Sequence, residues 1–192
     1  MTLRLGVLLS GSGRTLQNLV DRIAAGELDA EVAVVIADRD GVRGIERATA
    51  ASIPALVERD PLRTFEILRD HDVDLVCLAG YLRLLAPIPP EFRGRVLNIH
   101  PALLPKFGGK GFHGDAVHRA VLDAGETESG CTVHFCDEIY DHGHVLLQKR
   151  VPVRSDDDVA SLAARVFEAE CEAYPAAITE WVERSGATDA RQ

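Results

Sequence analysis

The sequence predicts a single α/β domain with a mostly parallel sheet, helices on both faces and an antiparallel extension in its C-terminal half. Strand and helix patterns alternate through the first 100 residues, as in successive βαβ units. Two later strand patterns are separated by one polar turn, which favours an antiparallel hairpin. A chain of 192 residues is long enough for one domain with a substantial core.

Short apolar runs in the first half predict strands, and apolar residues at helical spacing predict helices between them. The near-continuous run over 3–9 is typical of a strand that is covered on both faces. A glycine loop breaks this run, and a helix is expected over 14–25. Further strands are expected over 31–37, 54–57, 75–79 and 95–100, with helices over 45–51 and 61–70.

The pattern changes after residue 100. Residues 101–114 form a glycine-rich loop, and a helix is expected over 116–124. Strands over 131–136 and 145–151 flank a polar turn. A long helix over 157–184 closes the fold, with a bend expected near Pro175. We therefore predict one domain over 1–184 and a polar tail over 185–192 that frays.

Composition narrows the possible partners. The formal net charge of −9 argues against a protein that binds nucleic acid without sequence preference, since such a protein needs a broad basic face. The four cysteines form no C-x-x-C pair and are expected to be reduced thiols. No apolar run is long enough to span a bilayer, and a strand begins almost at residue 1. We therefore expect a cytoplasmic location and no membrane partner.

Asn98 and His100 are the first candidate site residues. They lie two positions apart at the end of a predicted strand, so their side chains share one face. Pro101 has no N–H and cannot continue a central strand, so the chain turns there. In open α/β sheets, ligands bind at the carboxyl ends of the strands. An amide donor beside an imidazole suits acyl chemistry, and a hydrogen-bonded histidine at a strand end is the structural alternative.

The glycine loop between the first strand and the first helix is a candidate anion site. Gly11 and Gly13 let the backbone approach a phosphate, and the first helical N–H groups would face it. Arg14 adds a charge-assisted partner. The third glycine of a dinucleotide fingerprint is absent, so that match is partial. If this loop bound a dinucleotide, Asp38 at the end of the second strand would hold the ribose.

The polar turn over 137–144 contains three carboxylates and two histidines. A solvated acidic turn is the ordinary interpretation. A metal site is disfavoured because the nearby histidines match no established ligand spacing. The histidines considered for it are His113, His118, His142 and His144. A carboxylate of this turn that met His100 across a cleft would favour the charged imidazolium.

Several motifs together resemble the folate-dependent formyltransferases. The run Asn98-Ile99-His100-Pro101-Ala102-Leu103-Leu104-Pro105 is similar to the signature of that family. Further motifs follow the family's order over nearly the whole chain. They are residues 8–13, 78–83, 130–135, Asp141-x-Gly143, Leu147-Gln148 and Tyr174-Pro175. The resemblance is greatest to the branch that formylates glycinamide ribonucleotide, and it implies a single-domain Rossmann-like formyltransferase fold.

The resemblance implies an activity. The amine of glycinamide ribonucleotide would attack the formyl carbon of the co-substrate 10-formyltetrahydrofolate, giving N-formylglycinamide ribonucleotide and tetrahydrofolate in purine biosynthesis. Asn98 and a protonated His100 match the residues that stabilise the oxyanion. Asp141 matches the catalytic aspartate that supports the histidine. His134 matches a supporting histidine beside the catalytic pair, and no metal is implied.

The resemblance also implies two groups of binding residues. The nucleotide group would hold the phosphate and the glycinamide amine, and its members are Gly11, Gly13, Arg14, Thr15, Phe167 and Glu170. The folate group would hold the pterin, and its members are Leu82, Arg83, Leu84, Leu85, Asn98, Asp137, Tyr140 and Asp141. On this basis, residues 1–100 form a phosphate- and nucleotide-binding half, and residues 101–184 form a folate-binding and closing half.

The sequence departs from the family's pattern in four places. One is the pair His142 and His144, which replace residues that are often glycine and proline. Arg14 stands where many members have serine, so a guanidinium could hold the phosphate here. The loop over 106–114 is richer in glycine than is usual. The arginine that contacts folate in many members has no clear counterpart, and Arg59 and Arg63 are both candidates.

Other functions fit parts of the sequence. One is formyl transfer from folate to a different amine, such as that of a sugar nucleotide. A nicotinamide-dependent oxidoreductase built on the first glycine loop and Asp38 would leave Asn98, His100 and Asp141 without a task. The same intact set argues against a catalytically inactive binding protein. The sequence leaves a monomer and a homodimer open.

Overall fold

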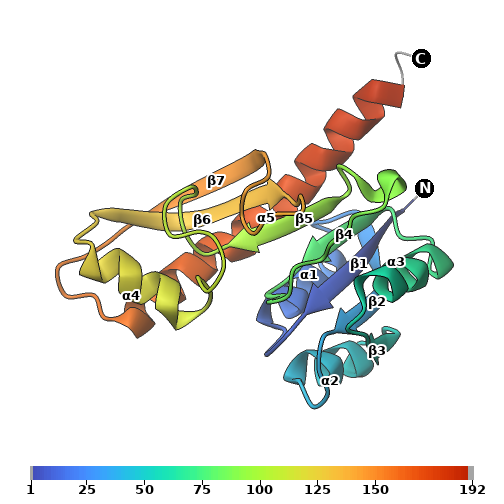
Figure 1. Cartoon of the computed structure of the whole chain (residues 1–192), viewed down its shortest axis with the longest axis horizontal. Helices are drawn as coiled ribbons and strands as arrows, with labels where there is room; N and C mark the ends of the chain where they lie inside the picture. Colours follow the sequence, from blue (N-terminus) through green and yellow to red (C-terminus); the bar gives the residue numbers. More distant parts are fainter. Residues whose placement is uncertain (1, 190–192) are drawn as a thin grey trace.

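The computed structural model describes residues 2–189 as one α/β domain built on a seven-stranded sheet (Figure 1). The strands are β1 (Leu3–Leu9), β2 (Ala30–Ala37), β3 (Ala55–Val57), β4 (Leu75–Leu78), β5 (Val96–His100), β6 (Glu128–Phe135) and β7 (Val145–Pro152). Their order is β3-β2-β1-β4-β5-β6-β7. The first five strands are parallel, and β6 and β7 add to them antiparallel. The predicted fold class is confirmed.

The α-helices agree with the predicted ones except at the ends, and one short 3₁₀ turn was not predicted. They are α1 (Arg14–Ala24), α2 (Arg43–Ala50), α3 (Pro61–Asp70), the 3₁₀ turn η1 (Pro90–Phe92), α4 (Asp115–Asp123) and α5 (Val159–Asp189). The predicted end of the last helix at residue 184 is wrong, because α5 continues through 185–189. Contacts one turn apart extend it: Arg184 pairs with Glu180, and Ser185 Oγ donates to the Trp181 carbonyl at 2.8 Å. The predicted fraying of residues 190–192 lies outside the described residues.

The sheet separates two apolar cores, one on each of its faces. The larger core packs the sheet against α1, α2, α4 and α5, and the smaller one packs it against α3 and η1. Leu97 and Ile99 belong to the larger core, and Val96 belongs to the smaller. Because alternate residues of a strand share a face, Asn98 and His100 lie on the same face of β5 as Val96, the face that α3 covers. They follow Val96 along the strand, past the part of β5 that belongs to the smaller core.

The carboxyl edge of the sheet has a topological switch point between β1 and β4. The chain passes from β1 to β2 on one side and later reaches β4 on the other side. The two loops that follow β1 and β4 are joined there: Ser10 N–H donates to the Gly80 carbonyl at 3.0 Å, and Leu82 N–H donates to Ser10 Oγ at 2.9 Å. Ligands bind in such a crevice in open α/β sheets. Within the described residues, no helix has the length and apolar character that a membrane span requires.

Candidate active site

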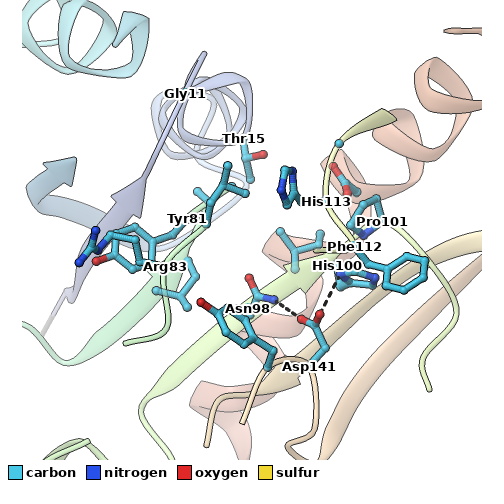
Figure 2. A pocket seen from close by; sticks show the side chains of 18 of the residues that line it. Gly11, Thr15, Tyr81, Arg83, Asn98, His100, Pro101, Phe112, His113 and Asp141 are labelled. Atoms are coloured by element: carbon cyan, nitrogen blue, oxygen red, sulfur yellow. Dashed lines mark hydrogen bonds and ion pairs between the residues drawn. The ribbon is translucent and has the colours of Figure 1, made fainter. Parts of the chain in front are cut away.

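A cavity of about 590 Å³ opens at the carboxyl ends of β1, β4 and β5 (Figure 2). The predicted catalytic set, the nucleotide group, the folate group and His134 all line this cavity. Residues from both predicted halves line it, among them 82–85 from the first half and Phe167 and Glu170 from the second. The fold therefore brings both halves to one cavity, and the roles of the residues stay predictions.

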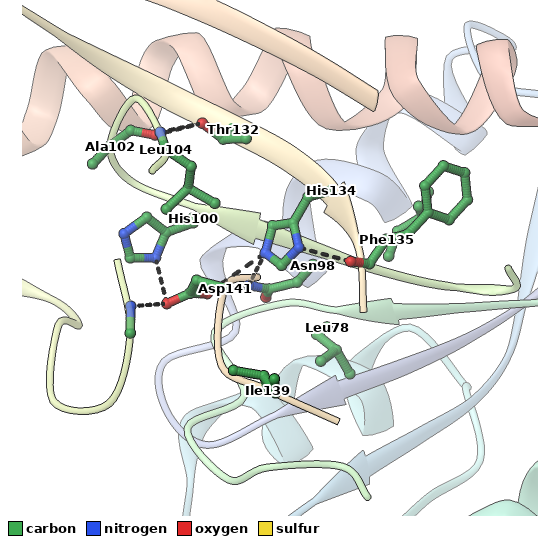
Figure 3. Close-up of polar contacts among 12 residues, drawn as sticks. Leu78, Asn98, His100, Ala102, Leu104, Thr132, His134, Phe135, Ile139 and Asp141 are labelled. Carbon is green, nitrogen blue, oxygen red and sulfur yellow. Dashed lines mark hydrogen bonds and ion pairs between the residues drawn. The ribbon is translucent and has the colours of Figure 1, made fainter. Parts of the chain in front are cut away.

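The register of β5 and β6 places Asn98 opposite His134. His134 Nδ1 lies 2.9 Å from the Phe135 carbonyl oxygen, which can only accept, so this nitrogen carries the proton. His134 Nε2 lies 3.1 Å from the Asn98 amide nitrogen and 3.5 Å from Asp141 Oδ1. The same amide nitrogen donates to Asp141 Oδ1 at 3.3 Å (Figure 3). His134 and Asp141 together fix the orientation of the Asn98 amide.

His100 is buried, with an acceptor facing each ring nitrogen. Its Nε2 donates to the Phe107 carbonyl at 2.7 Å, and its Nδ1 lies 3.6 Å from Asp141 Oδ2 (Figure 3). Burial lowers the pKa of His100 below its usual value, although Asp141 and the Phe107 carbonyl act in the opposite direction. The protonated His100 that the resemblance implies stays a prediction: burial disfavours the imidazolium, whereas Asp141 and the Phe107 carbonyl favour it.

Asp141 is held in the site as a carboxylate. Its backbone is left-handed, with φ of 53°, a conformation that aspartate tolerates better than most residues. Gly109 N–H donates to its Oδ2 at 2.9 Å. Burial would raise the pKa of Asp141, but His134, His100 and the Gly109 N–H together hold it below the usual value. Asp141 Oδ2 also lies 3.6 Å from His100 Nδ1, so the contact that the sequence alone could not establish is present.

The loop after β1 forms the opposite end of the cavity. Gly13 precedes α1 with φ of 69°, and a Cβ there would lie 2.6 Å from Gly44 Cα. This glycine permits both the left-handed turn and the close approach of α2. The Arg14 guanidinium carbon lies 4.3 Å from the centre of the Phe167 ring, so the cation stacks on an aromatic face. Burial raises the pKa of Glu170 to about 7, and Arg14 opposes this shift.

Three sequence candidates lie away from the cavity. Asp38 is buried and accepts two hydrogen bonds from Arg39, at 2.9 and 3.0 Å. It is not a lining residue, so the nicotinamide alternative loses its ribose ligand. Arg59 donates to the Asp38 carbonyl at 3.0 Å, and Arg63 pairs with Glu66. Neither candidate for the folate arginine lines the cavity.

The histidines considered for a metal have other surroundings. Among residues 2–189, no three His, Cys, Asp or Glu side chains are grouped so that they could hold a metal ion. His142 Nδ1 lies 2.6 Å from Asp137 Oδ2 instead. His113 and His118 line the cavity, but on the wall formed by the loop before α4 and by α4 itself.

Sequence reasoning missed two backbone groups that support the catalytic set. They are the Phe107 carbonyl, which accepts from His100, and the Gly109 N–H, which donates to Asp141. Both belong to the loop over 106–114. Its glycine content was the available signal, because a glycine loop often brings backbone groups close to other atoms.

Residues 3–178 match the model of the family described as formyl transferase. The chain belongs to this family. A curated relative from Drosophila melanogaster, the trifunctional purine biosynthetic protein adenosine-3, is 46% identical over 91% of this chain. A phosphoribosylglycinamide formyltransferase of Arabidopsis thaliana, named as chloroplastic, is 38% identical over 89% of it. The chain spans 14% of the length of the first relative and 62% of the second.

Solved structures share the fold of this family member. A glycinamide ribonucleotide transformylase 1 from Symbiobacterium toebii matches with a TM-score of 0.84 and 40% identity, covering 92% of this chain and 86% of the other. A phosphoribosylglycinamide formyltransferase from Brucella melitensis matches with a TM-score of 0.79 and 36% identity, covering 94% and 96%.

Proposed function

We propose that this protein transfers the formyl group of 10-formyltetrahydrofolate to the amine of glycinamide ribonucleotide in purine biosynthesis. The observation that carries the proposal is the convergence of Asn98, His100 and Asp141 in one cavity. The family and the printed names of the relatives support the same reaction.

The proposed reaction begins when the amine nitrogen attacks the formyl carbon and the carbonyl electron pair moves to oxygen. Asn98 shifts one N–H from its present partners to the oxyanion. Neutral His100 accepts a proton from the attacking nitrogen at Nδ1, where Asp141 stabilises the imidazolium. His100 then gives this proton to N10 of the folate as the bond between carbon and N10 breaks.

The nucleotide is proposed to bind between the loop after β1 and α5. The stacked Arg14 guanidinium and the N–H groups at the start of α1 are suited to a phosphate. Glu170 lies on the same wall and would accept from the glycinamide amine. Thr15 and Phe167 complete the proposed nucleotide group.

The folate is proposed to occupy the part of the cavity between 82–85 and the turn that carries Asp137, Tyr140 and Asp141. No metal takes part in the proposed steps, and the partners are the two small molecules. The four free thiols of the protein support a reducing compartment, and we propose the cytoplasm. The proposed assembly is a monomer or a homodimer.

A steady-state assay tests the proposal. Purified protein is mixed with 10-formyltetrahydrofolate and glycinamide ribonucleotide, and the absorbance change on release of tetrahydrofolate is followed. We expect turnover that depends on both substrates. A parallel assay with an amino-sugar nucleotide tests the other amine class. No turnover with glycinamide ribonucleotide, or a higher kcat/KM with the sugar nucleotide, would refute the proposed substrate.

A further inference from the structure

The glycine-rich loop over 106–114 forms a wall of the cavity. It is fixed at Gly109, whose N–H donates to Asp141, and at Asp115, where α4 begins. Between these points, Lys110 and His113 line the same cavity as the loop after β1. Figure 2 shows the His113 imidazole projecting into the cavity on the side of Thr15. The two glycine loops therefore face each other across the cleft.

Lys110 and His113 are exposed cationic or potentially cationic side chains without a protein partner. Within residues 2–189, neither has a hydrogen bond or an ion pair. Lys106 of the same loop differs, because its ammonium pairs with Glu126 at 2.7 Å. The chain has a formal net charge of −9, so carboxylates are plentiful. A cavity wall that nevertheless leaves such groups unpaired is suited to an anionic ligand.

His118 on α4 provides an independent observation on the same wall. Its side chain lines the cavity, is only 5% exposed, and has no hydrogen-bond partner at Nδ1 in the described part of the chain. Buried polar atoms normally have a partner, since leaving one unsatisfied costs free energy. This wall is therefore incomplete without a ligand or an ordered water.

The opposite wall already has the form of half an anion site. Arg14 is stacked on Phe167, which restricts the guanidinium before any ligand binds. The first N–H groups of α1 lie beside it, after the left-handed turn at Gly13. A dianion seated there would leave oxygen atoms facing the loop over 106–114.

We propose that Lys110 and His113 form the second wall of the phosphate subsite and bind the phosphomonoester of the nucleotide from the side opposite Gly13 and Arg14. The proposal rests on the proposed function, because it takes a ribonucleotide as the substrate. It also gives the loop two tasks at once. One segment contacts the phosphate, while the Phe107 carbonyl and the Gly109 N–H hold the catalytic pair.

Calorimetric titration of the double variant K110M/H113N tests this proposal with two probes, glycinamide ribonucleotide and its dephosphorylated riboside. We expect each single variant to weaken nucleotide binding about tenfold and the double variant more, since hydrogen bonds to charged groups are individually strong. Riboside affinity and the KM for 10-formyltetrahydrofolate should stay near wild type. Lys106→Met is the matched control, because it removes a lysine of the same loop that pairs with Glu126.

Two results would overturn the proposal. One is unchanged nucleotide affinity in the double variant, and the other is an equal loss of affinity for nucleotide and riboside, which would indicate a structural role. Titration with inorganic phosphate separates this proposal from the proposed function. If wild-type protein transfers no formyl group, weaker phosphate binding by the double variant still supports the subsite, and equal phosphate binding contradicts it.

Discussion

His100 Nδ1 lies 3.6 Å from Asp141 Oδ2, and this contact joins the end of β5 to the turn between β6 and β7. The pKa of the Asp141 carboxyl is held below its usual value, and burial lowers the pKa of the His100 imidazole. In the proposed reaction, His100 accepts a proton from the substrate, and Asp141 stabilises the imidazolium that forms. An oxyanion near His100 would add to the effect of Asp141 and favour the charged form.

Asp141→Asn should lower kcat by about a hundred- to a thousandfold, as is typical when one preorganised electrostatic group of an active site is removed. The imidazolium would lose its carboxylate, and only one oxygen would remain to accept from both the Asn98 amide and the Gly109 N–H. Single-turnover kinetics with saturating substrates measure the change. Glu138→Gln is the matched control, since it removes an exposed carboxylate from the same turn and should leave kcat within a factor of about two. Similar losses in both variants would contradict the role of Asp141.

Arg14→Met should raise the KM for the nucleotide about ten- to a hundredfold and leave the KM for folate unchanged, because a charged donor to the phosphate is removed. Arg14→Lys should recover part of the loss but not all of it, since lysine lacks the planar group that stacks on Phe167. Arg43→Met is the control, because Arg43 is exposed and does not line the cavity. An unchanged nucleotide KM in Arg14→Met would exclude a phosphate contact.

Glu170→Gln should change how stability depends on pH. The pKa of Glu170 is about 7 in the folded protein against a usual value of 4.5, so the folded state holds the extra proton between these values. Wild-type protein therefore loses the stability linked to this proton as pH rises through 7. His100 and His118 have lowered pKa values and act oppositely, because the unfolded chain takes up their protons first as pH falls.

The difference in the free energy of unfolding between Glu170→Gln and wild type isolates the contribution of Glu170, since both proteins contain the same histidines. Urea unfolding at pH 5 and pH 8 should show the variant gaining stability relative to wild type at the higher pH, by at most about 3 kcal/mol. A difference that is constant with pH would mean that the pKa of Glu170 is ordinary.

Tyr174→Phe tests how α5 is attached beneath the site. The buried hydroxyl lies 3.1 Å from the Leu78 carbonyl oxygen and 3.0 Å from that of Leu97, so it bridges β4 and β5 next to Asn98. Its removal should lower the free energy of unfolding by about 1–2 kcal/mol. Thr179→Val removes another hydroxyl from the same helix, one that bonds only within the helix, and should change stability by less than about 0.5 kcal/mol. Equal effects in urea titrations would argue against the bridge.

Local patterns predicted much of this structure. The apolar run over 3–9 became β1 with the expected bounds, because a strand buried on both faces leaves a continuous apolar signal. The spacing of Asn98 and His100 placed both on one face, since strand alternation depends on the sequence alone. Gly13 was similarly recognisable, because its left-handed turn precedes a helix.

Contacts between distant segments could not be predicted in the same way. The Asn98–His134 contact depends on the register of β5 against β6, which no local pattern fixes. The Phe107 carbonyl has no side-chain signature at all. Asp38 looked available for a ribose, but its neighbour Arg39 binds both carboxylate oxygens. The polar composition after residue 184 indicated a tail, whereas contacts one turn apart continued the helix.

The most direct measurement follows a ¹³C-labelled formyl group from 10-formyltetrahydrofolate in a single turnover with glycinamide ribonucleotide, using wild-type protein and His100→Ala. Mass spectrometry of the nucleotide should show the label on the glycinamide nitrogen for wild type. For His100→Ala, the transfer rate should fall at least about a hundredfold while nucleotide affinity in a binding titration is retained. Label transfer at the wild-type rate by His100→Ala, or no transfer by wild type, would contradict the assignment of this cavity as the site of formyl transfer.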